Sequence, residues 1–169
     1  DGALGQMMEK VKLSDYQPRW TREEVEEKWG SWATTGKGST RKKNIVTSLE
    51  MDSGRMEQNN IRFQEKFTEM EEKEVRFEAI QCDDAEYILV AFGTSSRVCQ
   101  KAVELARAKG LKVGLLRPIT LFPFPQKAIK ELARKVKGFL SVEMSAGQMV
   151  EDIKLAVYEA GSTVRVNYF

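Results

Sequence analysis

The side chains best suited to chemistry lie in two short turns, each of which joins an apolar run to a segment of helical period. One turn follows the run 85–93, and the other follows the run 138–144. A helix N-terminus presents free N–H groups and a partial positive charge, so these turns could bind an anion or a polar group of a partner. The candidate site residues are Thr94, Ser95, Ser96, Ser145, Gly147 and Gln148.

Ordinary helix capping is an alternative explanation of the same turns. A hydroxyl side chain at an N-cap accepts a hydrogen bond from the first helical turn, and Thr94 or Ser95 could take that position. The sequence alone leaves both interpretations open.

The sequence lacks the residues that most enzymes use for catalysis or metal binding. It has no histidine, the usual general base and the commonest metal ligand. Its two cysteines, Cys82 and Cys99, are too few for a four-cysteine metal site. Gly36-Lys37 lacks the earlier Gly and the following Ser or Thr of a P-loop, and no G-x-G-x-x-G follows the run 85–93. We therefore predict no catalytic residue and no metal site.

The elements that position the two turns follow from a regular alternation after residue 85. Four apolar, β-branched runs alternate with three segments of helical period, which predicts a three-layer α/β/α fold with a mostly parallel, twisted sheet. With a strand order of 2-1-3-4, the two turns flank the topological switch point, where open α/β sheets bind ligands. The runs are 85–93, 111–118, 138–144 and 162–169. The apolar stripes are Val98/Ala102/Leu105, Ile129/Leu132/Ala133/Val136 and Val150/Ile153/Ala156/Val157.

Residues 12–80 are polar and charged, with scattered aromatic side chains, and we expect them to form a partly helical arm that wraps a partner surface. Thr21 and Glu24 have the spacing of a capping box, which predicts a short helix that Gly30 would end. The boundary to the α/β domain is predicted at 79–84.

A long helix over about 53–78 is predicted within the arm, because Met56, Phe63, Met70 and Phe77 recur every seven residues. The remaining faces of this helix are charged, so it would bury one narrow side. That side packs against its own or a neighbouring domain, with a coiled-coil partner as the alternative.

Three prolines, Pro118, Pro123 and Pro125, exclude a helix or a central strand over residues 117–125. Pro125 suits the first turn of the next helix. Phe122 and Phe124 are expected to lie against the sheet edge or to face another subunit.

The net charge of +2 provides no overall attraction to nucleic acid or to a membrane. A solvated loop or subunit contact explains the basic cluster Lys37, Arg41, Lys42 and Lys43 better than phosphate binding does. No apolar run approaches the roughly 20 residues that span a bilayer. A cytoplasmic protein without nucleic-acid or membrane partners is expected.

The amino-acid sequences of several turns resemble the corresponding segments of a known protein family. Residues 117–125 and 142–149 closely resemble the alpha-type subunit of 2-oxoacid:ferredoxin oxidoreductases, and residues 90–97 resemble domain II of that family, the transketolase C-terminal-like domain. The arm, at 32–36 and 41–44, is most similar to the branched-chain (2-ketoisovalerate) branch.

The resemblance implies oxidative decarboxylation of a 2-oxoacid with thiamine diphosphate, transfer of the acyl group to coenzyme A, and electron flow through iron–sulfur clusters to ferredoxin. It also implies that residues 1–11 are a stub of a preceding pyrimidine-binding domain, 12–80 a linker arm and 81–169 the transketolase C-terminal-like domain. We expect a C-terminal fragment, inactive alone and without a bound cofactor, that contacts other subunits of the complex and could form a homodimer. A stand-alone module that binds an anionic ligand such as coenzyme A is the alternative.

Overall fold

The computed structural model describes residues 15, 17–34, 36, 38 and 41–169. The chain divides into two compact units, residues 1–60 and 61–169. The predicted stub at 1–11 and Lys37 of the basic cluster lie outside the described residues. The domain boundaries predicted from the sequence stay a prediction.

The second unit is built on a five-stranded sheet of order β1-β3-β2-β4-β5. The strands β2, β3, β4 and β5 are parallel, and β1 runs antiparallel along β3. The four predicted strands thus have the predicted order 2-1-3-4. The strand bounds are β1 Phe77–Ile80, β2 Tyr87–Ala91, β3 Val113–Pro118, β4 Gly138–Val142 and β5 Arg165–Tyr168.

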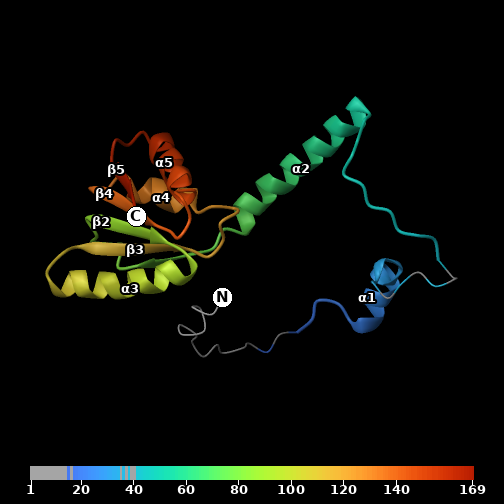
Figure 1. Cartoon of the computed structure of the whole chain (residues 1–169), viewed down its shortest axis with the longest axis horizontal. Helices are drawn as coiled ribbons and strands as arrows, with labels where there is room; N and C mark the ends of the chain where they lie inside the picture. Colours follow the sequence, from blue (N-terminus) through green and yellow to red (C-terminus); the bar gives the residue numbers. More distant parts are fainter. Residues whose placement is uncertain (1–14, 16, 35, 37, 39–40) are drawn as a thin grey trace. The chain divides into compact units, whose positions relative to one another are not determined.

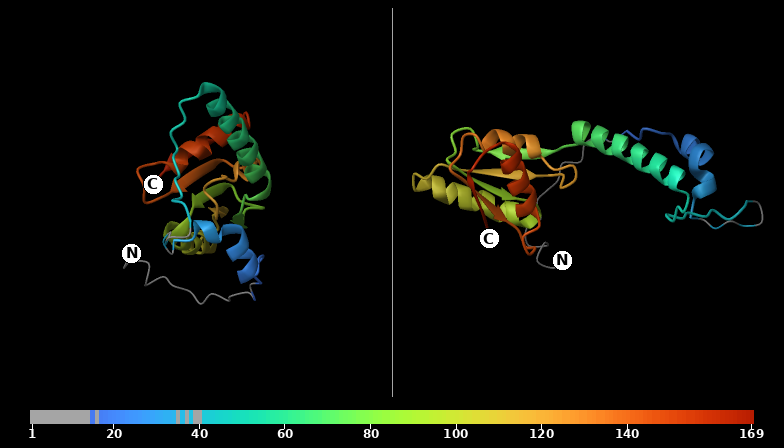
Figure 2. Two further views of the ribbon diagram at one scale, coloured as in Figure 1. Left: turned by 90° about the vertical axis from the view of Figure 1, so that its right-hand side faces the viewer. Right: turned by 90° about the horizontal axis from the view of Figure 1, so that it is seen from above.

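Helices cover both faces of the sheet, with α3 on one face and α4 and α5 on the other (Figure 1). Figure 2 shows the same layers from two further directions. Their bounds are α3 Gly93–Ala108, α4 Gln126–Leu132 and α5 Met149–Glu159. The predicted three-layer α/β/α architecture is therefore confirmed.

The alternation of side chains along the strands builds a separate core under each helical layer. In β2, Ile88 and Val90 pack with Ile129 of α4 and Ile153 of α5. Ala91, the next residue, belongs instead to the core beneath α3. The predicted stripes of α4 and α5 lie in these cores as expected, with Val150, Ala156 and Val157 among the buried residues.

The face that α3 turns toward the sheet differs from the predicted one. Val98 and Leu105 of the predicted stripe are exposed, whereas Cys99 and Val103 are buried against the sheet together with the polar Ser96. The buried residues Ser96, Cys99 and Val103 also recur at intervals of three and four, so helical spacing alone did not distinguish the two sides of the helix.

The predicted long helix ends earlier than expected, and this part of the prediction is wrong. Helix α2 spans Ser53–Lys73, and Phe77 lies in β1, where it pairs with Pro118. The N–H groups of Ile119 and Thr120 donate to the carbonyl of Arg76, which fixes the entry into β1. Pairing with β3 thus overrides the seven-residue spacing that continued the helix to residue 78.

Pro118 also contradicts its predicted exclusion from a central strand. It is the last residue of β3 and pairs there with an antiparallel edge strand, where its missing N–H is tolerated. The peptide bond between Phe122 and Pro123 is cis. Pro125 directly precedes α4, which agrees with its expected place at a helix start.

The first unit contains the predicted capped helix. Helix α1 spans Arg22–Trp29 and ends at Gly30, and a short 3-10 helix, η2, covers Gly30–Trp32. The Thr21 side chain accepts a hydrogen bond from the N–H of Glu24 at 3.2 Å, and the Glu24 carboxylate accepts one from the N–H of Thr21 at 2.8 Å. The capping box is therefore confirmed.

Among the described residues, no helix combines the length and the apolar character that crossing a membrane requires.

The close approach at Gly114 of β3 gives a first testable prediction. A Cβ built at Gly114 would lie 2.7 Å from the carbonyl oxygen of Gln81 and 3.0 Å from the Cα of Cys82. Because both atoms are backbone, Gly114→Ala should lower the free energy of unfolding by about 1–3 kcal/mol. Gly138→Ala in β4 is the matched control, since its nearest neighbour is a Tyr87 side-chain carbon at 3.4 Å. Urea unfolding of both variants measures the difference, and equal stabilities would contradict the prediction.

Candidate functional site

The predicted turns lie at the carboxyl edge of the parallel strands. Strands β2 and β4 are neighbours, and the chain leaves β2 for α3 on one face of the sheet and β4 for α5 on the other. The gap between β2 and β4 is therefore the topological switch point, as the sequence predicted. The two turns differ in the hydrogen bonds that hold them.

The turn after β2 leads directly into α3. Phe92 is the N-cap and provides no side-chain hydrogen bond, so the prediction of Thr94 or Ser95 as N-cap is wrong. Both residues lie half-buried in the first helical turn. Ser96 is fully buried, and its hydroxyl donates to the carbonyl of Gly93 at 2.7 Å. Ser96 is thus a structural residue, whereas Thr94 and Ser95 remain accessible at a helix end without a side-chain cap.

The side chain of Glu143, which was not among the predicted site residues, organises the turn after β4. Glu143 is 7% exposed, and its side chain accepts five hydrogen bonds. Oε1 accepts from the Ser141 hydroxyl at 3.0 Å and from the N–H of Val150 at 3.0 Å. Oε2 accepts from the Ser145 hydroxyl at 2.6 Å and from the N–H groups of Gln148 and Met149 at 3.1 and 2.9 Å.

The local sequence explains why this loop can fold back onto Glu143. Gly147 has a positive φ of 93°, a conformation that L side chains rarely adopt. The carbonyl of Ser145 accepts a hydrogen bond from the Tyr168 hydroxyl, which connects the turn to β5. The N–H of Glu143 donates to the carbonyl of Phe169 at 3.2 Å and so extends the pairing of β4 with β5.

The charge state of Glu143 follows from these contacts. Burial acts to raise the pKa of the Glu143 carboxyl, but hydrogen bonds to the charged form outweigh it and hold the pKa below its ordinary value. Among these hydrogen bonds, those from the Ser145 hydroxyl and the Met149 N–H lower the pKa most. Glu143 is therefore an ionised, internally satisfied carboxylate at neutral pH.

Ionised Glu143 occupies the place that an external anion would take at α5. The first N–H groups of this helix, at Gln148, Met149 and Val150, already donate to its oxygens. Of the predicted site residues in this turn, Ser145 also binds Glu143, Gly147 shapes the loop and the Gln148 side chain is exposed. The predicted anion site stays a prediction, and its accessible part is the start of α3.

Among the described residues, no three or more His, Cys, Asp or Glu side chains lie together where they could hold a metal ion. The Cys82 thiol contacts the carbonyl oxygens of Ile80 and Leu115 at 3.5 and 3.3 Å, and burial raises its pKa. Cys99 is buried in the core under α3, where burial likewise raises the thiol pKa.

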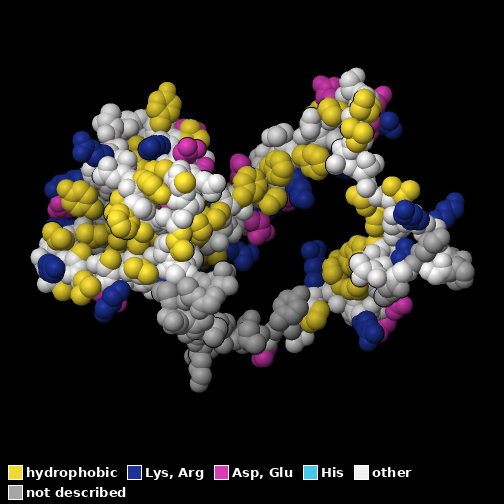
Figure 3. Space-filling view, in the orientation of Figure 1, with side chains coloured by type: hydrophobic (Ala, Val, Ile, Leu, Met, Phe, Trp, Pro, Cys, Tyr) yellow, Lys and Arg dark blue, Asp and Glu magenta, His cyan; other side chains and the backbone are white. Residues whose placement is uncertain are grey.

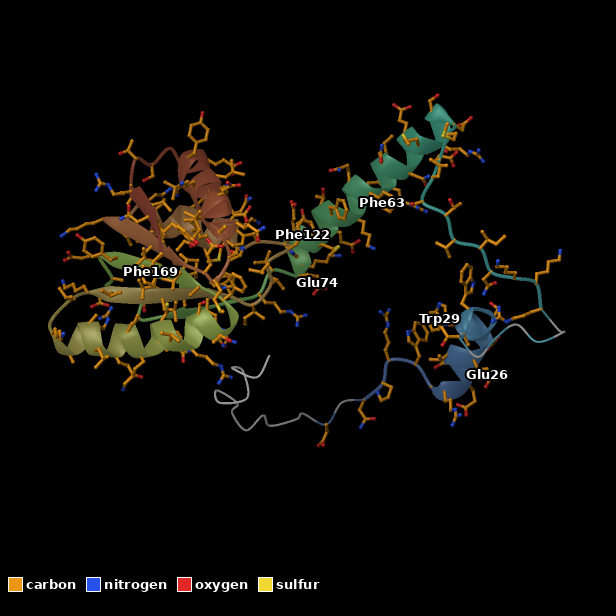
Figure 4. The ribbon with its side chains drawn as sticks, viewed as in Figure 1. Glu26, Trp29, Phe63, Glu74, Phe122 and Phe169 are labelled. Atoms are coloured by element: carbon orange, nitrogen blue, oxygen red, sulfur yellow. The ribbon has the colours of Figure 1, made fainter. Side chains whose placement is uncertain are left out.

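The loop from β3 to α4 is held at the same edge. The Thr120 hydroxyl accepts from the N–H of Arg76 at 3.0 Å and donates to the carbonyl of Pro123 at 2.9 Å. Phe124 packs against the core, as expected for one of the two phenylalanines. Phe122 is 57% exposed, and its ring meets that of Phe67 of α2 edge-on, with 5.6 Å between the ring centroids. Figure 4 labels Phe122 beside α2.

Glu143→Gln tests the role of the buried carboxylate. An amide keeps one acceptor oxygen but turns an NH₂ group toward donors, so the free energy of unfolding at pH 7 should fall by about 1–3 kcal/mol. Glu151→Gln is the matched control, because Glu151 is exposed in the first turn of the same helix. Denaturant unfolding of the two variants measures the effect, and a Glu143→Gln variant as stable as the control would contradict it.

The pH dependence of the same pair gives a second readout. Because folding lowers the pKa of Glu143, its contribution is fully present above the unfolded-state value of about 4.3 and is lost as the pH falls through the lower folded-state value. The stability gap between the unsubstituted chain and Glu143→Gln should therefore be constant above about pH 5 and shrink below about pH 4. A gap that widened on acidification would show that the sign is wrong.

Comparisons with known proteins identify the domain. A protein-family model described as pyruvate:ferredoxin oxidoreductase core domain II matches residues 85–169. Ketoisovalerate oxidoreductase subunit VorB of Methanothermobacter marburgensis and that of Methanothermobacter thermautotrophicus are each 51% identical over 157 residues, or 92% of this chain and 42% of each relative. The 2-oxoglutarate synthase subunit KorA of Methanocaldococcus jannaschii is 37% identical over 84 residues, or 50% of this chain and 22% of that relative.

A solved structure has the same fold. The 2-oxoglutarate:ferredoxin oxidoreductase from Magnetococcus marinus matches 78% of this chain and 24% of that chain, with a TM-score of 0.61 at 18% identity. The chain spans less than half the length of the VorB relatives. The resemblance noted in the sequence is confirmed, and the family match covers the α/β domain from β2 to the end of the chain. The chain therefore belongs to the family of pyruvate:ferredoxin oxidoreductase core domain II.

Proposed function

We propose that this chain is a non-catalytic, subunit-contacting part of a 2-oxoacid:ferredoxin oxidoreductase that acts on a branched-chain 2-oxoacid. The observation that carries the proposal is the 51% identity to ketoisovalerate oxidoreductase subunit VorB over 157 residues. That similarity covers 92% of the chain and so includes most of the arm as well as the α/β domain. In such an enzyme the 2-oxoacid loses carbon dioxide, its acyl group passes to coenzyme A, and two electrons per turnover reduce ferredoxin.

The chemistry of the described residues supports a non-catalytic role. Glu143 is the buried carboxylate at the switch point, and five hydrogen bonds to its charged form make it a weak base. The two cysteines lie apart in different surroundings. Thiamine diphosphate and the iron–sulfur clusters would therefore be held by other parts of the complex. Free thiols at Cys82 and Cys99 favour a reducing cytoplasm.

Exposed apolar side chains at the carboxyl edge support subunit contact. Met144 follows β4 and is 87% exposed, and Phe122, in the loop that follows β3, is 57% exposed. Figure 3 shows hydrophobic side chains grouped on the visible face of the α/β unit and along α2. Apolar groups that gather beside a topological switch point fit a protein partner, and Glu143, the buried carboxylate at that point, is already satisfied. Ferredoxin would be reached indirectly, through the subunits that carry the clusters.

A ligand-binding role is the second candidate, and one observation limits it to a single helix. The start of α3 has no side-chain cap, and half-buried Thr94 and Ser95 lie there, so an anionic ligand such as coenzyme A could bind its N–H groups. The start of α5 is occupied by Glu143. A ligand would therefore contact one of the two predicted turns.

Binding to the partner subunits tests the proposed function. This chain, added to the other subunits of a ketoisovalerate oxidoreductase, should bind them, and Met144→Glu should weaken binding at least about tenfold, which corresponds to about 1.4 kcal/mol. Leu111→Glu is the matched control, because Leu111 is 58% exposed just before β3, at the opposite edge of the sheet. Biolayer interferometry measures both. The chain alone should not reduce a viologen dye with 2-ketoisovalerate and coenzyme A.

Two results would contradict the proposal. One is 2-oxoacid oxidation by the isolated chain. The other is failure to bind any subunit together with a rise in melting temperature with coenzyme A that Ser95→Ala removes, which would favour the ligand-binding role. Ser96 is unsuitable for this substitution, because its fully buried hydroxyl binds Gly93 and its loss would disturb the fold.

A further inference from the structure

Helix α2 carries an apolar surface that its own domain leaves uncovered. No residue of α2 is buried, and within the second unit Phe63 and Phe67 are 44% and 38% exposed. The two rings stack on each other at 6.4 Å, and Phe67 also meets Phe122 of the β3–α4 loop. A helix with one apolar stripe and charged remaining faces normally buries that stripe against another element. The stripe of α2 therefore lacks most of its cover.

The spacing of this stripe is that of a coiled-coil seam. Phe63, Phe67 and Met70 follow one another at intervals of four and three, the d, a and d positions of a heptad. Ile61, which is 54% exposed, lies two residues before Phe63 and hence on nearly the opposite side of the helix. The apolar stripe is therefore narrow, as in a helix that pairs with one other helix.

The residues that flank the seam indicate both the partner and its direction. Gln64 and Glu71 occupy e positions, and Lys66 and Lys73 occupy g positions. Two copies of α2 in parallel register place Lys66 of one copy beside Glu71 of the other, twice by symmetry. An antiparallel pair places g beside g and e beside e, so like charges would meet. The charge pattern complements itself in the parallel arrangement.

We propose that the uncovered seam of α2 binds the α2 helix of a second copy of this chain, parallel and in register, with Phe122 extending the contact beside Phe67. Lys66 and Glu71 set the direction of the pair, and the phenylalanines supply the buried area. The inference deepens the proposed role in subunit contact, on which it rests, by naming one contact surface and its occupant. The paired surfaces are the same patch on both copies, as a two-fold dimer requires.

Sedimentation velocity of the full 169-residue chain, from micromolar to about 1 mM, tests the pairing. A reversible dimer is expected, and Phe63→Glu should raise its dissociation constant at least about tenfold. Ile61→Glu is the matched control, since it introduces the same charge at a similarly exposed position on the other side of the helix, and it should leave the constant unchanged. A monomer at every concentration, or equal effects of both substitutions, would overturn the proposal.

Two further variants test the direction. Lys66→Glu should weaken the dimer, and the double variant Lys66→Glu/Glu71→Lys should restore it. Met70→Cys should cross-link across the pair on oxidation, because parallel d positions face each other, with the unsubstituted chain as the control for Cys82 and Cys99. Absence of rescue or of cross-linking would rule out the parallel register. Self-association needs no partner subunit, so a monomeric chain would overturn this pairing and leave the proposed function standing.

Discussion

The buried carboxylate of Glu143 is the interaction on which the carboxyl edge of this domain depends. A carboxylate removed from water is tolerated when hydrogen bonds replace its hydration, and Glu143 accepts five of them. Its partners come from the end of β4, from the following turn and from the start of α5. Through Ser145, whose carbonyl binds Tyr168, the same turn is also connected to β5. One side chain thus fixes the angle between a strand and the helix that follows it.

The same interaction limits where this fold could bind an anionic ligand at its switch point. In open α/β sheets, helix N-termini at this point offer N–H groups to anions. At α5 the protein provides the anion itself, so these N–H groups stabilise the fold through Glu143. The edge keeps exposed apolar side chains, Met144 and Phe122, which suit a protein surface better than a small charged molecule.

Much of the fold could be predicted because its signals are local. Alternating apolar runs and helical stripes predicted the four parallel strands and their order. The capping box of Thr21 and Glu24 predicted α1. The edge strand β1 escaped prediction because Phe77 fits a seven-residue helical spacing equally well. Only its pairing with Pro118, far along the chain, decides between strand and helix.

Glu143 was not predicted as a site residue, for a related reason. Its partners Gln148, Met149 and Val150 are backbone groups five to seven residues away, and they become donors only once α5 begins at Met149. A single acidic residue at the end of an apolar run, followed by Ser, Gly and a helical stripe, was the available signal. Thr94 and Ser95 were predicted as site residues because their hydroxyl groups can be read from the sequence. The positions of backbone N–H donors cannot be read in this way.

Phe122 relates the two surfaces that the domain leaves uncovered. It follows β3 at the carboxyl edge, yet its ring contacts Phe67 in the seam of α2. Most of the stability of a helix in a protein comes from packing of its apolar face, so α2 depends on contacts such as this one and on whatever covers the rest of its seam. Thr120 holds the loop through Arg76, immediately before β1, so the start of the sheet, the loop and the helix are fixed together. A subunit docked at the carboxyl edge would then contact the same loop that supports α2. Binding at the carboxyl edge would therefore also stabilise the seam of α2.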